Sequence, residues 1–267
     1  MKPAYLLIVL GLLALGTEVH AAKYRIERSY PHGGPYLGKK TIIQFSLFRG
    51  TETTPLRASD LQIEHEKLIH LMTIDSGFQE YLHEHPEEVA SGIWEVPVLI
   101  RTAGDYRFYL QFLPEDEITT KTVTFDDRFV SDPSQVVPSS PVNPGEQLTF
   151  VDGDFKVTLN YVGGQKPVQK QVAQVYFTIE KNGVVIPFHD LDLYLGTQMH
   201  IAGISGDKND FVHAHPGEGN ADGNPDPREI TKLYFKQSGF HGLFMQYQYK
   251  GVVHTNQFAL RVKSVLP

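Results

Sequence analysis

Cysteine is absent from the 267-residue chain. Its absence excludes disulfide bonds, thiolate metal sites, a cysteine nucleophile and lipid attachment at cysteine. Long apolar runs are also absent, except at residues 4–15, which are too few to span a bilayer comfortably. This run follows Lys2 and precedes a small-residue cleavage site, so we predict a secretory signal peptide over residues 1–22, with a retained anchor as the alternative. The mature chain should then be secreted or periplasmic, without membrane insertion.

Clusters of basic residues are missing as well. The net charge is −7 and the pI is near 5.9, which makes nucleic acid and anionic membranes poor partners because both attract positive patches. No Ser-His-Asp order, paired-carboxylate motif or phosphate-binding loop stands out from the sequence. We therefore expect a protein that is not an enzyme.

Helical periodicity longer than a turn or two is not found, and strand-like stretches dominate instead. KKTIIQFSLFRG (39–50), GDYRFYLQFLP (104–114) and DFKVTLNYVGG (154–164) are rich in β-branched and aromatic residues, and turn residues separate them. Lys250-Gly251 lies between two such runs and predicts a hairpin. The sequence therefore predicts an all-β protein.

The two halves of the chain resemble one another. GDYRFYLQF at residues 104–112 lies over GFHGLFMQY at residues 239–247, and the segments before them also align. A repeat of about 120 residues indicates a duplicated domain, and about seven short strands in each half favour an immunoglobulin-like sandwich. We predict two tandem immunoglobulin-like antiparallel β-sandwich domains and a proline-rich linker, with these boundaries: domain 1 at 23–127, linker at 128–147, domain 2 at 148–267.

One histidine pattern occurs in both halves. LIHLMTIDSGFQEYLHEHP (68–86) and QMHIAGISGDKNDFVHAHP (198–216) each contain a histidine, twelve residues and then His-x-His-Pro. Residues i and i+2 of a strand point to one face about 6.5–7 Å apart. The paired histidines should therefore lie side by side, and a hairpin would bring the earlier histidine to the same face.

The register of each hairpin follows from the expected turn. A two-residue turn at Ser76-Gly77 places His70 directly across from His83, and a turn at Gly206-Asp207 places His200 across from His213. Three neutral imidazoles in one patch are a standard ligand set for Zn(II) or Cu(II). In an exported protein without thiolates we expect copper, with zinc as the alternative. The predicted ligands are His70, His83 and His85 in domain 1, and His200, His213 and His215 in domain 2.

The second half carries two further histidines on its last predicted hairpin. His241 and His254 lie where the first half has Tyr106 and, roughly, Thr119. We therefore consider His241 and His254 as additional metal ligands of domain 2, with capping of strand ends as the alternative.

The quoted motifs resemble a family of little-characterised exported bacterial β-sandwich proteins. PFHDLDLYLGTQMHIAGISGDKNDFVHAHP (187–216) and GLFMQYQYKGVVHTNQFALRV (242–262) carry the likeness in the second half, and HEKLIHLMTIDSGFQEYLHEHPE (65–87) carries it in the first. FixH- and YtkA-type immunoglobulin-like domains look like more distant relatives. The resemblance implies metal handling in the cell envelope, with copper as the expected ion. The second-half pattern includes His254 but not His241.

Three functions are compatible with these observations. We favour an exported metal-binding protein that buffers copper or delivers it to a membrane transporter or an oxidase-assembly protein. One alternative is a non-catalytic adhesion or scaffold module in which the six repeated histidines are structural. The other is a metal-dependent hydrolase or oxidase, because three ligands leave a coordination position open.

Overall fold

The computed structural model describes residues 23–131, 145–217 and 229–265. They form two antiparallel β-sandwiches in tandem, each made of two sheets, and contain no α-helix in the described ranges. The predicted all-β, tandem immunoglobulin-like fold class is therefore confirmed. The predicted signal peptide and residues 132–144 of the predicted linker lie outside the described residues.

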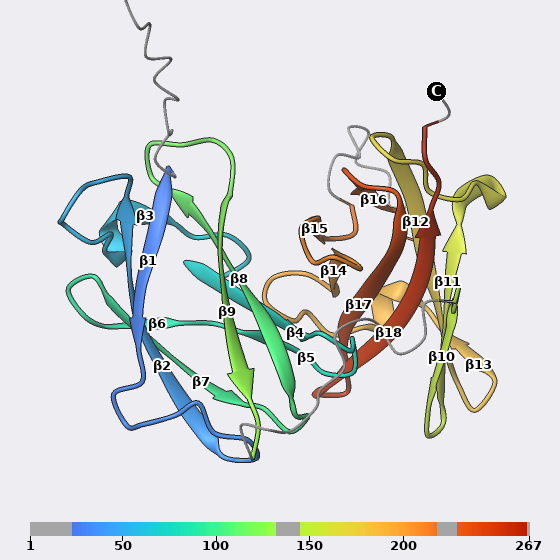
Figure 1. Ribbon diagram of the computed structural model, residues 1–267. Coiled ribbons are helices and arrows are strands. Elements are labelled where there is room, and N and C mark those ends of the chain that lie inside the picture. Colours follow the sequence, from blue (N-terminus) through green and yellow to red (C-terminus); the bar gives the residue numbers. More distant parts are fainter. Residues whose placement is uncertain (1–22, 132–144, 218–228, 266–267) are drawn as a thin grey trace, which may run out of the picture.

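Each sandwich has an outer and an inner sheet (Figure 1). The outer sheet of the first sandwich contains β1 (Tyr24–Ser29), β2 (Lys40–Arg49), β6 (Glu87–Ala90) and β7 (Ile93–Leu99). Its inner sheet contains β3 (Leu61–Gln62), β4 (Ile69–Asp75), β5 (Tyr81–Glu84), β8 (Gly104–Pro114) and β9 (Lys121–Phe129). A short 3-10 helix, η1 (Ala58–Asp60), precedes β3.

The second sandwich repeats this plan. Its outer sheet contains β10 (Thr149–Asp152), β11 (Phe155–Tyr161), β12 (Val172–Lys181), β13 (Val184–Ile186) and β16 (Thr231–Tyr234). Its inner sheet contains β14 (Met199–Ser205), β15 (Phe211–Ala214), β17 (Gly239–Tyr249) and β18 (Val252–Val262). Two 3-10 helices, η2 (Val162–Gly164) and η3 (Phe188–Asp190), lie in its connections.

Each sandwich has its own hydrophobic core between its two sheets. Trp94 of the outer sheet and Phe108 of the inner sheet belong to the first core, and Val175 and Phe258 belong to the second. Alternate residues of β2 point into the first core, as expected for a strand with one buried face. Met199 and Met245 also lie in the second core, where flexible thioethers fill space between β-branched and aromatic side chains.

The two inner sheets pack against each other through the faces that point away from the cores of their own sandwiches. All seven residues of β4 and all seven of β14 are buried, so both faces of these strands are covered. Ile74, Phe78 and Tyr109 of the first sandwich form a third apolar cluster with Ile204 and Phe244 of the second. The fold is therefore four sheets deep, with a packed interface between the sandwiches.

Two aromatic stacks cross this interface in equivalent positions. Tyr81 stacks on Phe244 with ring centroids 4.6 Å apart, and Phe211 stacks on Tyr109 at 4.5 Å. Tyr81 aligns with Phe211, and Tyr109 aligns with Phe244, when the two halves are superposed in sequence. The sandwiches therefore meet in a reciprocal, approximately two-fold arrangement, as a self-complementary dimer would.

The turns confirm one prediction and correct another. Lys250 and Gly251 both have positive φ and join β17 to β18 as a two-residue hairpin turn. In contrast, Met72 rather than His70 pairs with His83, and Ala202 rather than His200 pairs with His213. The predicted register of both histidine hairpins is therefore wrong by two residues.

A longer loop causes this shift. Four residues, 76–79, connect the paired residues Asp75 and Glu80, because the Asp75 carboxylate accepts hydrogen bonds from the backbone N–H groups of Gly77, Gln79 and Glu80. A shift of two residues leaves every side chain on its original face. The three histidines of each motif therefore still share one face.

No helix among the described residues is long and apolar enough to cross a membrane.

The close approach at Gly242 generates a prediction. A Cβ atom at this position would lie 2.5 Å from Cδ1 of Phe78, across the interface. We expect Gly242→Ala to lower the free energy of unfolding by about 1–3 kcal/mol because the aromatic ring must shift within packed surroundings. Urea unfolding of this variant, Phe78→Ala and the double variant measures the coupling. Strictly additive effects of the two substitutions would contradict the contact.

Candidate metal centre

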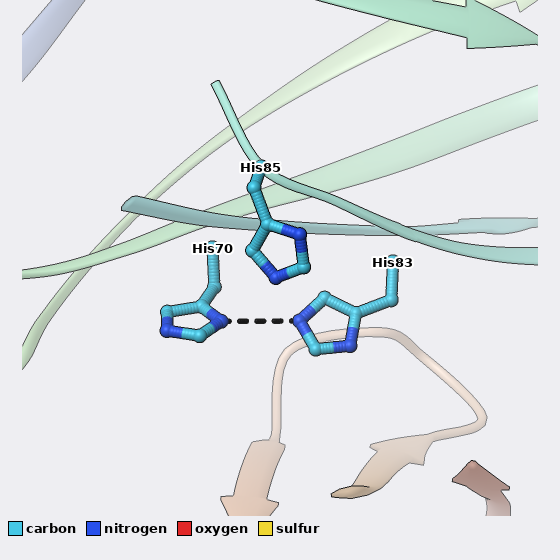
Figure 2. Close-up of side chains that lie close together, drawn as sticks. All are labelled: His70, His83 and His85. Atoms are coloured by element: carbon cyan, nitrogen blue, oxygen red, sulfur yellow. Dashed lines mark hydrogen bonds between the residues drawn. The ribbon is translucent and has the colours of Figure 1, made fainter. Parts of the chain in front are cut away.

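The three repeated histidines of the first half form one group, here called the first trio: His70, His83 and His85. His70 lies on β4, His83 lies on β5, and His85 follows β5. One ligand nitrogen from each residue lies within 4.8 Å of the others. Figure 2 shows the His85 ring directed towards the gap between His70 and His83, whose facing nitrogens are 3.1 Å apart. The predicted convergence of these imidazoles is confirmed.

The second trio is formed in the same way by His200 on β14, His213 on β15 and His215 after β15. One nitrogen of each lies within 4.8 Å of the others. Nδ1 of His200 lies 3.0 Å from Nε2 of His215. Each trio therefore has a donor set and a spacing that could hold a metal ion.

The two trios face each other across the interface between the sandwiches. The ring centroid of His83 lies 5.4 Å from that of His200 in the other sandwich, and equally far from that of His70 in its own. His213 lies 5.4 Å from His70 and 5.9 Å from His200. Six imidazoles therefore form one continuous cluster instead of two remote sites.

Two glutamines form hydrogen bonds between the sandwiches, each with a histidine of the opposite sandwich. Nδ1 of His83 donates a hydrogen bond to Oε1 of Gln246 in the opposite sandwich at 2.9 Å, and Nδ1 of His213 donates to Oε1 of Gln111 at 2.6 Å. Gln246 also donates from its amide nitrogen to the hydroxyl oxygen of Thr255 at 3.0 Å. These hydrogen bonds leave Nε2 of His83 and of His213 without a proton.

The first residue of each trio is oriented by a backbone carbonyl. Nε2 of His70 donates to the oxygen of Glu64 at 3.0 Å, and Nε2 of His200 donates to the oxygen of Tyr194 at 2.8 Å. Their Nδ1 atoms are therefore the unprotonated ones. Metal-binding histidines typically donate their second N–H to a carbonyl group in this way, which fixes the tautomer and the direction of the ring.

This assignment of protons leaves two lone pairs facing each other. In the neutral first trio, Nδ1 of His70 and Nε2 of His83 are both acceptors, yet they lie 3.1 Å apart. Nε2 of His85 and Nε2 of His213 are buried and have no hydrogen-bond partner among the described residues. Unsatisfied buried acceptors cost about 1–3 kcal/mol each. A cation at the centre of each trio would satisfy these nitrogens.

Burial keeps five of the six trio imidazoles neutral. Loss of solvent lowers the pKa of His70 to about 4 and the pKa values of His85 and His200 to about 3. The pKa values of His83 and His213 are also well below the usual value, first because of burial and then because of neighbouring histidines. The nitrogen lone pairs are therefore available at neutral pH, as metal binding requires.

His241 and His254 do not join the second trio. His241 pairs with Ser205 and His254 pairs with Tyr247, so both lie on the core face of the inner sheet, whereas the trio occupies the opposite face. Nε2 of His241 contacts Oδ2 of Asp210 at 3.3 Å, and His254 packs on Tyr247. The expectation that these two histidines are ligands of the trio is corrected by the alternation of faces along a strand.

Sequence reasoning missed three residues of this site. Gln111 and Gln246 are equivalent in the alignment of GDYRFYLQF with GFHGLFMQY, and this shared glutamine was the available signal. His65 reaches across the interface and packs on His215 with ring centroids 3.6 Å apart. It has a positive φ of 47° in a tight turn, a strained conformation for a residue with a side chain.

A small cavity reaches the cluster. Its volume is about 110 Å³, and both sandwiches contribute to its lining. The lining residues are Glu64, His65, His70, Gln111, Thr120, His213 and His215. Members of both trios therefore share one cavity.

The lowered pKa values predict how stability depends on pH. Unfolded histidines take up protons near pH 6.5, whereas His70 stays neutral in the fold until about pH 4. The unfolded state thus binds more protons in this window, so the free energy of unfolding of the metal-free protein should fall as pH decreases below about 6.5. Urea unfolding in the presence of a metal chelator, between about pH 7 and about pH 5, measures how the free energy of unfolding changes with pH. His85→Asn should lower the number of protons taken up on unfolding by up to one. A flat profile would contradict buried neutral histidines.

Comparisons with solved structures show only distant likeness. Invasin, a bacterial integrin-binding protein, is 12% identical, with 91% of this chain covered, 40% of its own chain covered and a TM-score of 0.26. The D00-D0 domain of intimin is 12% identical over 89% of this chain and 99% of its own, with a TM-score of 0.22. This chain therefore spans less than half of the invasin chain. TM-scores this low carry no argument about function.

Sequence comparison is more informative about the family. No curated protein matches the chain. A family model described as a domain of unknown function, DUF8832, matches residues 20–128 and 149–264. These two segments include both trios and both cross-linking glutamines, and they make up most of the sequence. The chain belongs to the DUF8832 family.

Proposed function

We propose that this protein binds transition-metal ions, copper in preference to zinc, through one histidine trio in each sandwich. The observation that carries the proposal is the contact between Nδ1 of His70 and Nε2 of His83. With Nε2 of His70 donating to the oxygen of Glu64 and Nδ1 of His83 donating to Oε1 of Gln246, the two facing nitrogens are both acceptors at 3.1 Å, an arrangement in which neither donates to the other. A bound cation accounts for it and for the unpartnered Nε2 atoms of His85 and His213.

The ligand chemistry favours copper. Each trio offers three neutral nitrogens, and nitrogen sites bind Cu²⁺ more tightly than Zn²⁺. Burying a charge away from water is costly, and none of the six imidazoles offsets the charge of an ion. Cu⁺ carries one charge and Cu²⁺ carries two, so Cu²⁺ would need a further negative group near the site.

The setting of the site favours transport or buffering of the ion. A cavity of about 110 Å³ borders His70, His213 and His215, and an incoming ligand from a partner can use such an opening. The predicted signal peptide supports export, which would bring the protein to the cell envelope. The resemblance to FixH- and YtkA-type domains supports the same role. The partners would be a membrane metal transporter or an oxidase-assembly protein.

Equilibrium dialysis tests the proposal. The chain without residues 1–22 should bind Cu⁺ or Cu²⁺ more tightly than Zn²⁺, with a dissociation constant below about 10 μM. The double variant His213→Ala/His215→Ala should lose the ion of the second trio. His189→Ala removes an exposed histidine outside both trios and is the matched control. Weaker binding, or binding unaffected by the double variant, would leave the scaffold function as the better explanation.

The glutamines give an independent test. Gln246→Leu removes the group that orients His83 and should weaken ion binding by the first trio about 10- to 100-fold. Gln111→Leu should do the same to the second trio through His213. Gln248→Leu changes a partly exposed glutamine on the same strand as Gln246 and should leave both affinities unchanged. Competition titrations against a chromophoric chelator measure these values, and equal affinities in all three variants would count against the assigned orientation of the ligands.

A further inference from the structure

The distances between the trios are comparable to the longer distances within them. His83 lies 5.4 Å from His200 and 5.6 Å from His213 of the opposite trio, measured between ring centroids. Within the first trio the corresponding distances are 4.7–5.4 Å, and within the second they are 4.6–5.9 Å. Two ions held by the trios would therefore be near neighbours.

We infer that the two trios form one dinuclear centre, in which a pair of ions faces each other across the interface and binds one small anion between them. The inference rests on the proposed function and adds a ligand and a coupling between the two sites. In two-metal sites a shared ligand commonly bridges ions that are about 3.5–4 Å apart.

Charge provides the first argument for the anion. Two divalent ions would bring four positive charges into a buried cluster whose six ligands are neutral. Lys67 adds a further positive charge near His70 and His85. One carboxylate, Glu64, lines the cavity and offsets only part of this charge. An anion from solvent would reduce the remaining cost of burying the ions.

Space provides the second argument. The cavity of about 110 Å³ is lined by His70 of the first trio together with His213 and His215 of the second. A water molecule occupies about 30 Å³ in the liquid, so this space accommodates a group of up to about three heavy atoms. A ligand in the cavity would border histidines of both trios.

A single shared ion is the competing arrangement. His70, His213 and His215 line the same cavity and include members of both trios, so one ion could bind there. This arrangement would leave Nε2 of His85, which is buried and has no hydrogen-bond partner among the described residues, without a ligand role. Stoichiometry separates the two arrangements: two ions per chain for the dinuclear centre and one for the shared site.

Copper(II) loading followed by electron paramagnetic resonance tests the inference on the chain without residues 1–22. His85→Ala and His213→Ala each disable one trio and supply reference spectra of a single ion. An anion that bridges two Cu²⁺ ions pairs their unpaired electrons, and paired electrons give no signal. The unsubstituted protein should bind two ions, and its signal per copper should be lower than in either variant.

Azide serves as the probe anion in a parallel titration monitored by visible absorption. The unsubstituted protein should bind one azide for two copper ions, and His189→Ala should behave in the same way. Two copper ions with full signals and separate azide sites, or saturation by one ion, would overturn the inference while leaving copper binding intact. No copper binding would overturn the proposed function itself.

Discussion

The packing of the two inner sheets against each other is the constraint on which the site depends. A histidine trio on one sheet would be a surface feature if the sheet faced solvent. Here β4 and β14 are covered on both faces, and the reciprocal hydrogen bonds of His83 with Gln246 and His213 with Gln111 cross the contact. The interface buries the imidazoles, fixes two of their tautomers and brings the trios together.

The buried interface contains both groups that stabilise the fold and groups that destabilise it. The apolar cluster around Ile74, Tyr109 and Phe244 stabilises the interface by removing apolar surface from water. The same interface encloses nitrogen atoms of His85 and His213 that have no hydrogen-bond partner in the described parts of the chain. These groups oppose folding in the metal-free state. Under the proposed function, an ion would convert that cost into binding free energy.

Duplication of one domain explains why the two sandwiches contribute equivalent residues to their interface. Later divergence of the two copies explains why the surroundings of the two trios differ. The His70 and His200 positions, the His-x-His pairs and the two glutamines are the same in both halves. The turn at His65 differs, because the second half has Leu195 there, although both residues have positive φ. The cavity borders His65 and two members of the second trio. The two trios therefore have unequal surroundings despite identical spacing.

Much of the fold could be predicted because it follows from local patterns. Alternation of apolar residues, turn residues and the internal repeat were enough to predict tandem sandwiches. The offset H-x12-H-x-H was enough to predict that His70, His83 and His85 share a face. The hairpin register was not predictable from the turn sequence alone. The Asp75 side chain competes for backbone N–H groups and lengthens the loop by two residues.

Strand periodicity is a local property of the backbone, so the sequence alone was enough to predict the number and spacing of the histidines in each trio. The sequence also predicted that His241 and His254 lie on the last hairpin of the second half. It did not show that they occupy the face of the sheet opposite to the second trio. That the two trios share one buried cluster became apparent only from the packing of the two sandwiches. That outcome depends on contacts between residues more than 100 positions apart, such as Gln111 with His213, and no local pattern encodes them.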